Sequence, residues 1–211
     1  MKKIFCLLTL LSILSSAFAA EMTVSIGAGE NWKSKHNPQF AVWLEDNDGN
    51  FLCTLLVTER ASRKNWIFGP KQGRPESLPV WYHVSKNQTA DKTEQSSDMS
   101  KIDDVTSATP KGGTVFKAEI GSVPCKIKAE FNTSFDYNDS YTKKNSGVNG
   151  QPSVVYGAEI PADFSSGEIV LEFLGTGSLD GSDGIIHEGT EGLTTSLKIV
   201  KAVAIVPSSS R

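Results

Sequence analysis

Residues 39–59 contain two apolar segments separated by Asn-Asp-Gly-Asn, and this feature limits the fold of the chain more than any other. The segments are FAVWLED, which ends at residue 46, and FLCTLLVTE, residues 51–59. Asp-Gly between two apolar runs predicts a β-hairpin, because glycine readily adopts the positive φ of a tight turn. FLCTLLV is apolar on both faces, which favours a position central to a sandwich.

Further short segments have the composition of strands. In CKIKAEF, residues 125–131, apolar residues alternate with two lysines and Glu130, which predicts a strand with one wet face. The other predicted strands are MTVSI (22–26), PVWYHVS (79–85), TVFKAEI (114–120), SVVYGAEI (153–160), EIVLEFLG (168–175) and KAVAIVP (201–207). Helical signals are scarce, and only residues 192–199 favour a short helix. We therefore expect an all-β fold, an antiparallel β-sandwich of immunoglobulin or fibronectin type.

The N-terminus has the pattern of a cleavable signal peptide. Lys2 and Lys3 precede a short apolar run, and Ala17-Phe18-Ala19 offers the small-x-small site of a signal peptidase. The run is shorter than the ~20 residues that cross a bilayer, and no later segment is apolar enough to do so. We expect export to the periplasm with residues 1–19 removed, leaving one domain over residues 20–211.

The charge of the chain bears on its partners. Removal of Lys2 and Lys3 with the signal peptide changes the formal net charge from -3 to -5. Nucleic acids and anionic membranes are bound through basic patches. The acidity argues against both. The partner that we expect is a periplasmic protein or a small ligand.

Two cysteines, Cys53 and Cys125, remain in the expected mature chain. An oxidising compartment favours a disulfide between them. Two buried free thiols on neighbouring strands are the alternative, because a free cysteine packs like a small hydrophobic residue. Spacing alone leaves both alternatives open.

Several phrases of the chain, in order, resemble a bacterial predicted-periplasmic family, domain of unknown function 2271. They include FAVWLEDNDGNFLCTL, DDVTSATPKGG, AEFNTSFDYNDSY, NGQPSVVYGAEI and GTGSLDGSDGIIHEGTEGLTTSLKIV, and the resemblance extends from about residue 39 to about residue 206. It implies a small secreted immunoglobulin-like protein with no established enzyme activity, associated with periplasmic flavin or electron-transfer systems. It supplies no catalytic residues.

Residues 103–109, DDVTSAT, partly match the pattern on which flavin mononucleotide (FMN) is attached to threonine: Asp, two residues, Ser or Thr, Gly, Ala, Thr. Asp103, Thr106 and Thr109 fall in register, and the Thr109 hydroxyl would attack the pyrophosphate of FAD. Ser107 stands where glycine is expected, and its Cβ disfavours a positive φ. The alternative is a polar turn before the strand at residues 114–120.

The segment LDGSDGIIHEG carries potential metal ligands, Asp180, Asp183 and His187. Carboxylate oxygens on a glycine-rich loop suit calcium, and His187 with an aspartate suits a transition metal. The alternative is an acidic turn in which the aspartates accept hydrogen bonds from backbone N–H groups.

Two further groups of residues allow a binding or a structural interpretation. The first is aromatic and accompanied by arginines, and it either stacks on a ligand ring or closes the end of the core. Its members are Trp32, Trp66, Trp81, Tyr82, Arg60, Arg63 and Arg74. The second is either a site or a strand ending in an Asx-rich turn. Its members are Asp136, Asn138, Asp139 and Tyr141.

These patterns favour a non-catalytic periplasmic sandwich that binds a partner protein or ligand through the loops at one end. One alternative is a redox accessory protein with FMN attached at Thr109. The other is a metal-dependent enzyme that uses residues 180–188. A nucleophilic enzyme is not indicated, because the chain lacks a G-x-S-x-G motif and has three histidines without a readable partner set.

Overall fold

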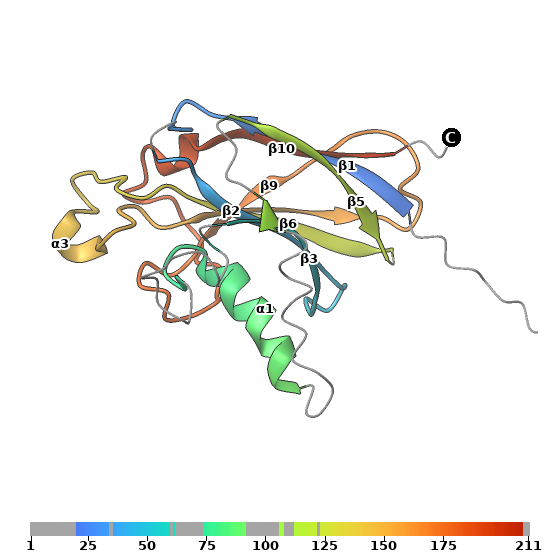
Figure 1. The fold of residues 1–211 in the computed structure, drawn as a ribbon, viewed down its shortest axis with the longest axis horizontal. Coiled ribbons are helices and arrows are strands. Elements are labelled where there is room, and N and C mark those ends of the chain that lie inside the picture. Colours follow the sequence, from blue (N-terminus) through green and yellow to red (C-terminus); the bar gives the residue numbers. More distant parts are fainter. Residues whose placement is uncertain are drawn as a thin grey trace, which may run out of the picture.

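The computed structural model describes residues 20–33, 36–59, 61, 74–91, 106–107, 112–121 and 123–208. They form two β-sheets packed face to face, with one long helix below the larger sheet in Figure 1. The predicted all-β antiparallel sandwich is confirmed. None of the helices within these described ranges is long and apolar enough to cross a membrane.

The smaller sheet has the strand order β5-β1-β10-β8, and all its neighbouring strands are antiparallel. Its strands are β1 (Ala20–Ala28), β5 (Thr114–Ile120), β8 (Ile169–Val170) and β10 (Val200–Pro207). Strands predicted at 22–26, 114–120 and 201–207 are therefore confirmed.

The larger sheet has the order β4-β3-β2-β6-β7-β9. Its strands are β2 (Gln39–Glu45), β3 (Phe51–Thr58), β4 (Thr106–Ser107), β6 (Cys125–Asn132), β7 (Val154–Ile160) and β9 (Glu172–Thr176). The predicted hairpin is confirmed, since β2 pairs antiparallel with β3 and Gly49 of the turn has φ 86. The two-residue strand β4 pairs in parallel with β3.

The main core lies between the two sheets. Cys125, Ile127, Ala129 and Phe131 alternate along β6 and are all buried in it, as the sequence pattern predicts. The rings of Phe40 and Phe131 lie 5.5 Å apart between their centroids.

The strand predicted at residues 79–85 is wrong, because this segment is the start of helix α1 (Pro79–Asp91). The helix continues through residues 86–91, the polar stretch KNQTAD, in which no strand is predicted. Pro79 occupies the first helical position, where its missing N–H costs no hydrogen bond. Val80, Trp81 and Tyr82 are buried against the outer face of the larger sheet. A short apolar run fits a strand or a buried helix equally well, and this packing selects the helix.

Two further strand predictions need correction. The segment 168–175 is two strands, because β8 pairs with β10 in the smaller sheet and β9 pairs with β7 in the larger one. Leu171 is buried at the crossing point between them. Strand β3 is not central, since only the two residues of β4 lie beyond it, and its Leu52 is exposed.

The helical signal at residues 192–199 corresponds to a single 3-10 turn, η1 (Ser196–Lys198). A second short helix, α3 (Lys143–Ser146), lies in the connection between β6 and β7. Figure 1 shows α3 at the left of the molecule, away from the C-terminus. The connections 29–38, 133–153 and 177–199 join strand ends on that side, which we call the loop end.

Candidate functional site

The outer face of the larger sheet holds a fully buried carboxylate, Glu130 of β6. Its Oε1 accepts hydrogen bonds from the Ser153 hydroxyl at 2.6 Å and the Val80 N–H at 3.3 Å. Its Oε2 accepts one from the Trp81 N–H at 2.8 Å. These two N–H groups lie in the first turn of α1 and have no partner within the helix. Glu130 therefore caps α1 from the sheet, and its predicted place on a wet face is wrong because α1 covers it.

Burial raises the pKa of Glu130 to about 7, although the bonds from Ser153, Trp81 and Val80 favour the charged form. A carboxyl group that titrates near neutrality is often catalytic. Here the side chain is 0% exposed, and its acceptors are occupied by donors of the protein itself. The geometry thus supports a structural role, in which Glu130 joins α1 to the sheet.

A second buried carboxylate, Asp136, organises the loop end. Its Oδ2 accepts hydrogen bonds from Asn31 Nδ2 at 3.1 Å and from Gln151 Nε2 at 2.9 Å. Its Oδ1 accepts from Thr195 Oγ1 at 2.8 Å and from Lys33 Nζ at 3.1 Å. We call these five residues the Asp136 network. It joins the connections at residues 29–38, 133–153 and 177–199.

Gln151 and Gly150 tighten this network. Gln151 is buried, and its Oε1 accepts hydrogen bonds from the Thr194 N–H and from Ser196 Oγ. Gly150 has φ 79, and a Cβ there would lie 2.4 Å from the backbone oxygen of Asp136. The two parts of the 133–153 connection can approach this closely only because residue 150 is glycine.

Phe135, next to Asp136, has a conformation that is uncommon for a bulky residue. Its φ is 62, in the left-handed region, while its side chain is 49% exposed. Its N–H donates to the Val148 oxygen at 2.8 Å, and the Val148 side chain is also 49% exposed. The rings of His36 and Tyr137 lie 5.1 and 6.4 Å from the Phe135 ring. These four residues, His36, Phe135, Tyr137 and Val148, form what we call the end surface.

The sequence predicts either a site or an Asx-rich turn at Asp136, Asn138, Asp139 and Tyr141. Asp136 belongs to the Asp136 network, and Asn138 forms a turn. Asn138 Oδ1 accepts hydrogen bonds from the N–H groups of Ser140 and Tyr141 at 3.0 and 2.8 Å. The structure therefore confirms the Asx-rich turn.

The potential metal ligands Asp180, Asp183 and His187 lie on a loop that packs against α1. Asp180 Oδ1 accepts the Ser182 N–H at 3.0 Å, and Asp183 Oδ1 accepts the Ile185 N–H at 2.9 Å. Hydrogen bonds from the Ser182 side chain and then its N–H hold the pKa of the Asp180 carboxyl below the ordinary value, and the bond from the Ile185 N–H does the same for Asp183. Asp183 Oδ1 also lies 3.1 Å from His187 Nε2.

No group of three or more His, Cys, Asp or Glu residues within the described ranges could hold a metal ion. The contacts of the two aspartates are those of the acidic turn, the alternative interpretation of this segment. The loop packs directly against His83 of α1. The His83 Nε2 atom lies 3.0 Å from the Gly181 oxygen. Gly184 lies so close to the helix that a Cβ atom on residue 184 would be 2.5 Å from the Cβ of His83.

The predicted flavin residues Asp103 and Thr109 lie outside the described residues. Of Thr106 the structure describes only the backbone, which pairs with Val57 of β3. Attachment of FMN at Thr109 stays a prediction.

The aromatic group has a structural role where it is described. Trp32, Trp81 and Tyr82 are all buried, as expected for residues that close a core. Arg74 is held by Glu76 and Asn149. The remaining members, Trp66, Arg60 and Arg63, lie outside the described residues.

Both cysteines are free thiols in this structure, Cys53 exposed and Cys125 buried. Cys53 lies opposite Leu44, and Leu44 lies opposite Ile127 of β6, so that β2 separates the two cysteine-bearing strands. Two strand spacings amount to about 10 Å, more than the roughly 7 Å that a disulfide spans between Cα atoms. The disulfide alternative is thus not formed in this register. Burial raises the pKa of the Cys125 thiol, and the nearby Cys53 adds to this effect.

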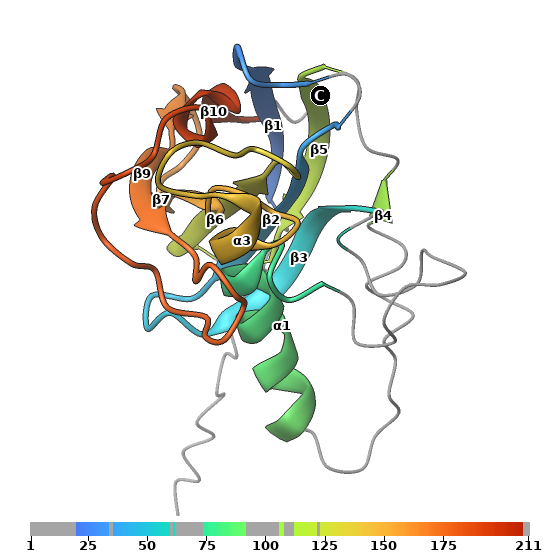
Figure 2. The same ribbon diagram turned by 90° about the vertical axis from the view of Figure 1, so that its left-hand side faces the viewer.

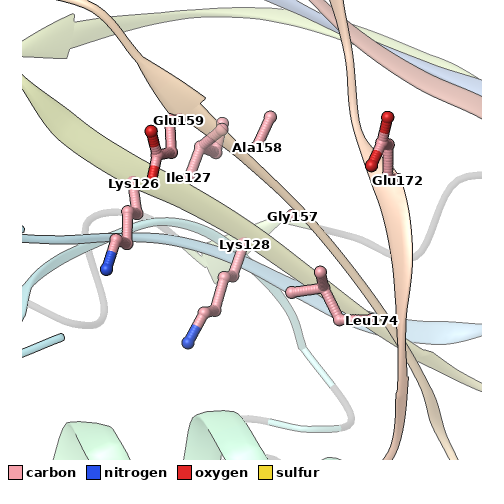
Figure 3. Close-up of a pocket in the computed structure, with 8 residues that line it drawn as sticks. All are labelled: Lys126, Ile127, Lys128, Gly157, Ala158, Glu159, Glu172 and Leu174. Carbon is pink, nitrogen blue, oxygen red and sulfur yellow. The ribbon is translucent and has the colours of Figure 1, made fainter. Parts of the chain in front are cut away.

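An open depression of about 320 Å³ lies on the outer face of the larger sheet, over β6, β7 and β9 (Figure 3). Lys126 and Lys128 line it, but both amines are engaged by the protein: Lys126 Nζ donates to the Asn47 oxygen at 2.8 Å, and Lys128 Nζ lies 2.7 Å from Glu45 Oε2. We assign no ligand to this depression.

Comparison with known proteins gives no identity. No family model matches the chain, and no match was found among curated proteins or solved structures. The resemblance to domain of unknown function 2271 therefore stays a prediction.

Sequence reasoning missed Glu130 and Phe135. The alternation of β6 assigns Glu130 to solvent, and only the packing of α1 reverses this. The left-handed conformation of Phe135 has no signal in the sequence, because it arises from the hydrogen bonds of its neighbours.

Proposed function

We propose that the protein is a non-catalytic periplasmic accessory protein that binds a partner protein through its end surface. The observation that carries this proposal is Phe135, a large apolar residue that is half exposed and held at φ 62. Such a conformation costs on the order of 1–3 kcal/mol and persists only where the surrounding structure imposes it. Here the backbone is held on both sides of Phe135, because its N–H donates to the Val148 oxygen and the Gln151 N–H donates to the Asp136 oxygen.

The chemistry of the end surface supports a protein partner. Phe135, Tyr137 and Val148 present aromatic and aliphatic surface, and aromatic residues are enriched in protein interfaces and in their energetic hot spots. The network beneath them fixes the backbone before binding, which reduces the ordering entropy lost on association.

A photo-crosslinking experiment in the producing bacterium tests this proposal. The full chain would carry a photoreactive phenylalanine analogue at position 135, with a matched control at Val170, which is 51% exposed on β8. We expect a discrete adduct from position 135 only, and its loss when Val148→Ser and Tyr137→Ala are added. Equal adducts from both positions, or none from position 135, would contradict the proposal.

A further inference from the structure

The edges of the two sheets differ in how they are protected. Strands β8 and β4 have two residues each. Strand β9 is irregular where it pairs with β7, and Thr176 at its end exchanges hydrogen bonds of 2.9 and 2.8 Å with His187. A short strand, a bulge and a covering segment are three of the means by which proteins prevent edge-to-edge pairing.

Strand β5 has none of these protections among the residues that the structure describes. It is seven residues long, pairs in unbroken register with β1 and ends its sheet. Figure 2 shows β5 beside β1, as the outermost strand on that side of the smaller sheet. Alternate N–H and C=O groups of such a strand point away from its neighbour and can pair with a further strand.

The outer face of β5 also carries an unbalanced charge. Glu119 lies directly opposite Glu21 of β1, and like charges in this position are destabilising. Lys117 reaches across to Glu21 Oε1 at 2.5 Å, but Glu119 has no cation on β1. Its charge would be balanced by a lysine on a strand added to the free edge.

We infer that β5 pairs antiparallel with β5 of a second copy of this chain, in the register that places Ala118 opposite Ala118. In that register each Lys117 faces Glu119 of the other copy, which gives two reciprocal ion pairs on the outer face. On the inner face, Phe116 meets Ile120 of the other copy, and both are apolar residues turned toward the core. A register centred on residue 117 would place Lys117 opposite Lys117, and one centred on residue 119 would place Glu119 opposite Glu119, so that like charges would repel each other.

The two copies are related by a two-fold axis, and their smaller sheets join into one continuous sheet. Because the contact rests on one strand and its side chains, we expect a weak dimer with a dissociation constant on the order of 10 µM. This inference is independent of the end surface.

Light scattering after size-exclusion chromatography, over a range of concentrations, tests the dimer. We expect the wild-type mass to rise from one chain toward two. Glu119→Lys places opposite charges together within one chain, because residue 119 lies opposite Glu21. In the dimer it places two positive charges together, because residue 119 faces Lys117 of the other copy. It should therefore weaken association at least tenfold without lowering the melting temperature.

The exchange variant Lys117→Glu with Glu119→Lys should restore association, because the ion pairs are only reversed. Glu172→Lys, the same charge change at an exposed position of β9, should leave association unchanged. A monomeric wild type at all concentrations would overturn the inference. So would undiminished association of Glu119→Lys, or a folded exchange variant that stays monomeric.

Discussion

The cluster at Glu130 and the network at Asp136 both bury a carboxylate among several donors, but they satisfy it differently. Glu130 receives backbone N–H groups of a helix and one hydroxyl, and no cation contacts it among these bonds. Asp136 receives three side-chain donors and, in addition, the ammonium group of Lys33. The first arrangement fastens a helix and titrates near neutral pH, and the second fixes a loop beside an exposed aromatic surface. A buried carboxylate can thus serve as an anchor or as a support for a site, depending on what donates to it.

The largest expected effect comes from removing the anchor. Glu130→Ala leaves the N–H groups of Val80 and Trp81 buried without an acceptor, and we expect a loss of about 4 kcal/mol in the free energy of unfolding near pH 5. Urea unfolding followed by circular dichroism measures it. Glu130→Gln, which keeps the size and one acceptor, should lose less than half as much. Equal losses in both variants would contradict the capping role.

The next prediction concerns pH. The pKa of Glu130 is about 7 in the folded chain, against an ordinary value of 4.5, so the folded state binds the proton more tightly than the unfolded state. Its contribution to stability is full below pH 4.5 and is lost as the pH rises to about 7, by about 3 kcal/mol. The difference in unfolding free energy between wild type and Glu130→Gln, measured across this range, should change by this amount, with wild type losing stability relative to the variant as the pH rises. Parallel profiles would show that Glu130 does not titrate there.

The Asp136 network should cost less to break, because Lys33 is partly exposed and can be hydrated after its partner is lost. We expect Asp136→Ala to lower the free energy of unfolding by about 2 kcal/mol. Asp136→Asn, which keeps an acceptor, should lose about half of that. Hydrogen exchange should increase within residues 133–153 and remain unchanged in α1. An increase in both regions would remove the distinction between the two clusters.

The smallest effect is expected at Phe135, where stability and binding should separate. Glycine adopts φ 62 without strain, so Phe135→Gly should raise the free energy of unfolding by about 1 kcal/mol relative to Phe135→Ala. Both variants should lose the partner crosslink, which is read from a photoreactive group at Val148 instead. A crosslink that survives both substitutions would exclude Phe135 from the binding surface.

Most of the strands could be predicted from local patterns. Alternation along residues 125–131 and Asp-Gly between apolar runs depend on near neighbours in the chain, and so β6 and the β2–β3 hairpin were identified correctly. The Asx turn at Asn138 also follows from local hydrogen bonding. Of the candidate site, Asp136 was identified, although only as a member of a possible polar site and not as the centre of a network.

The errors arise where distant segments decide the outcome. Residues 79–85 form an apolar run without a clear period, and they become a helix because the larger sheet offers an apolar outer surface and the Glu130 carboxylate. Glu130 in turn is buried because that helix covers it. Neither fact can be derived without the other, since residues 130 and 81 meet only in the folded chain.

The sequence alone therefore determined the antiparallel sandwich, because strand alternation and turn chemistry act between residues close in the chain. The tertiary structure decided which charges are buried, where the helix lies, and that Phe135 is exposed in a left-handed conformation. These properties depend on contacts between segments far apart in sequence. The physical reason is that burial and backbone strain are set by the surroundings of a residue rather than by its type.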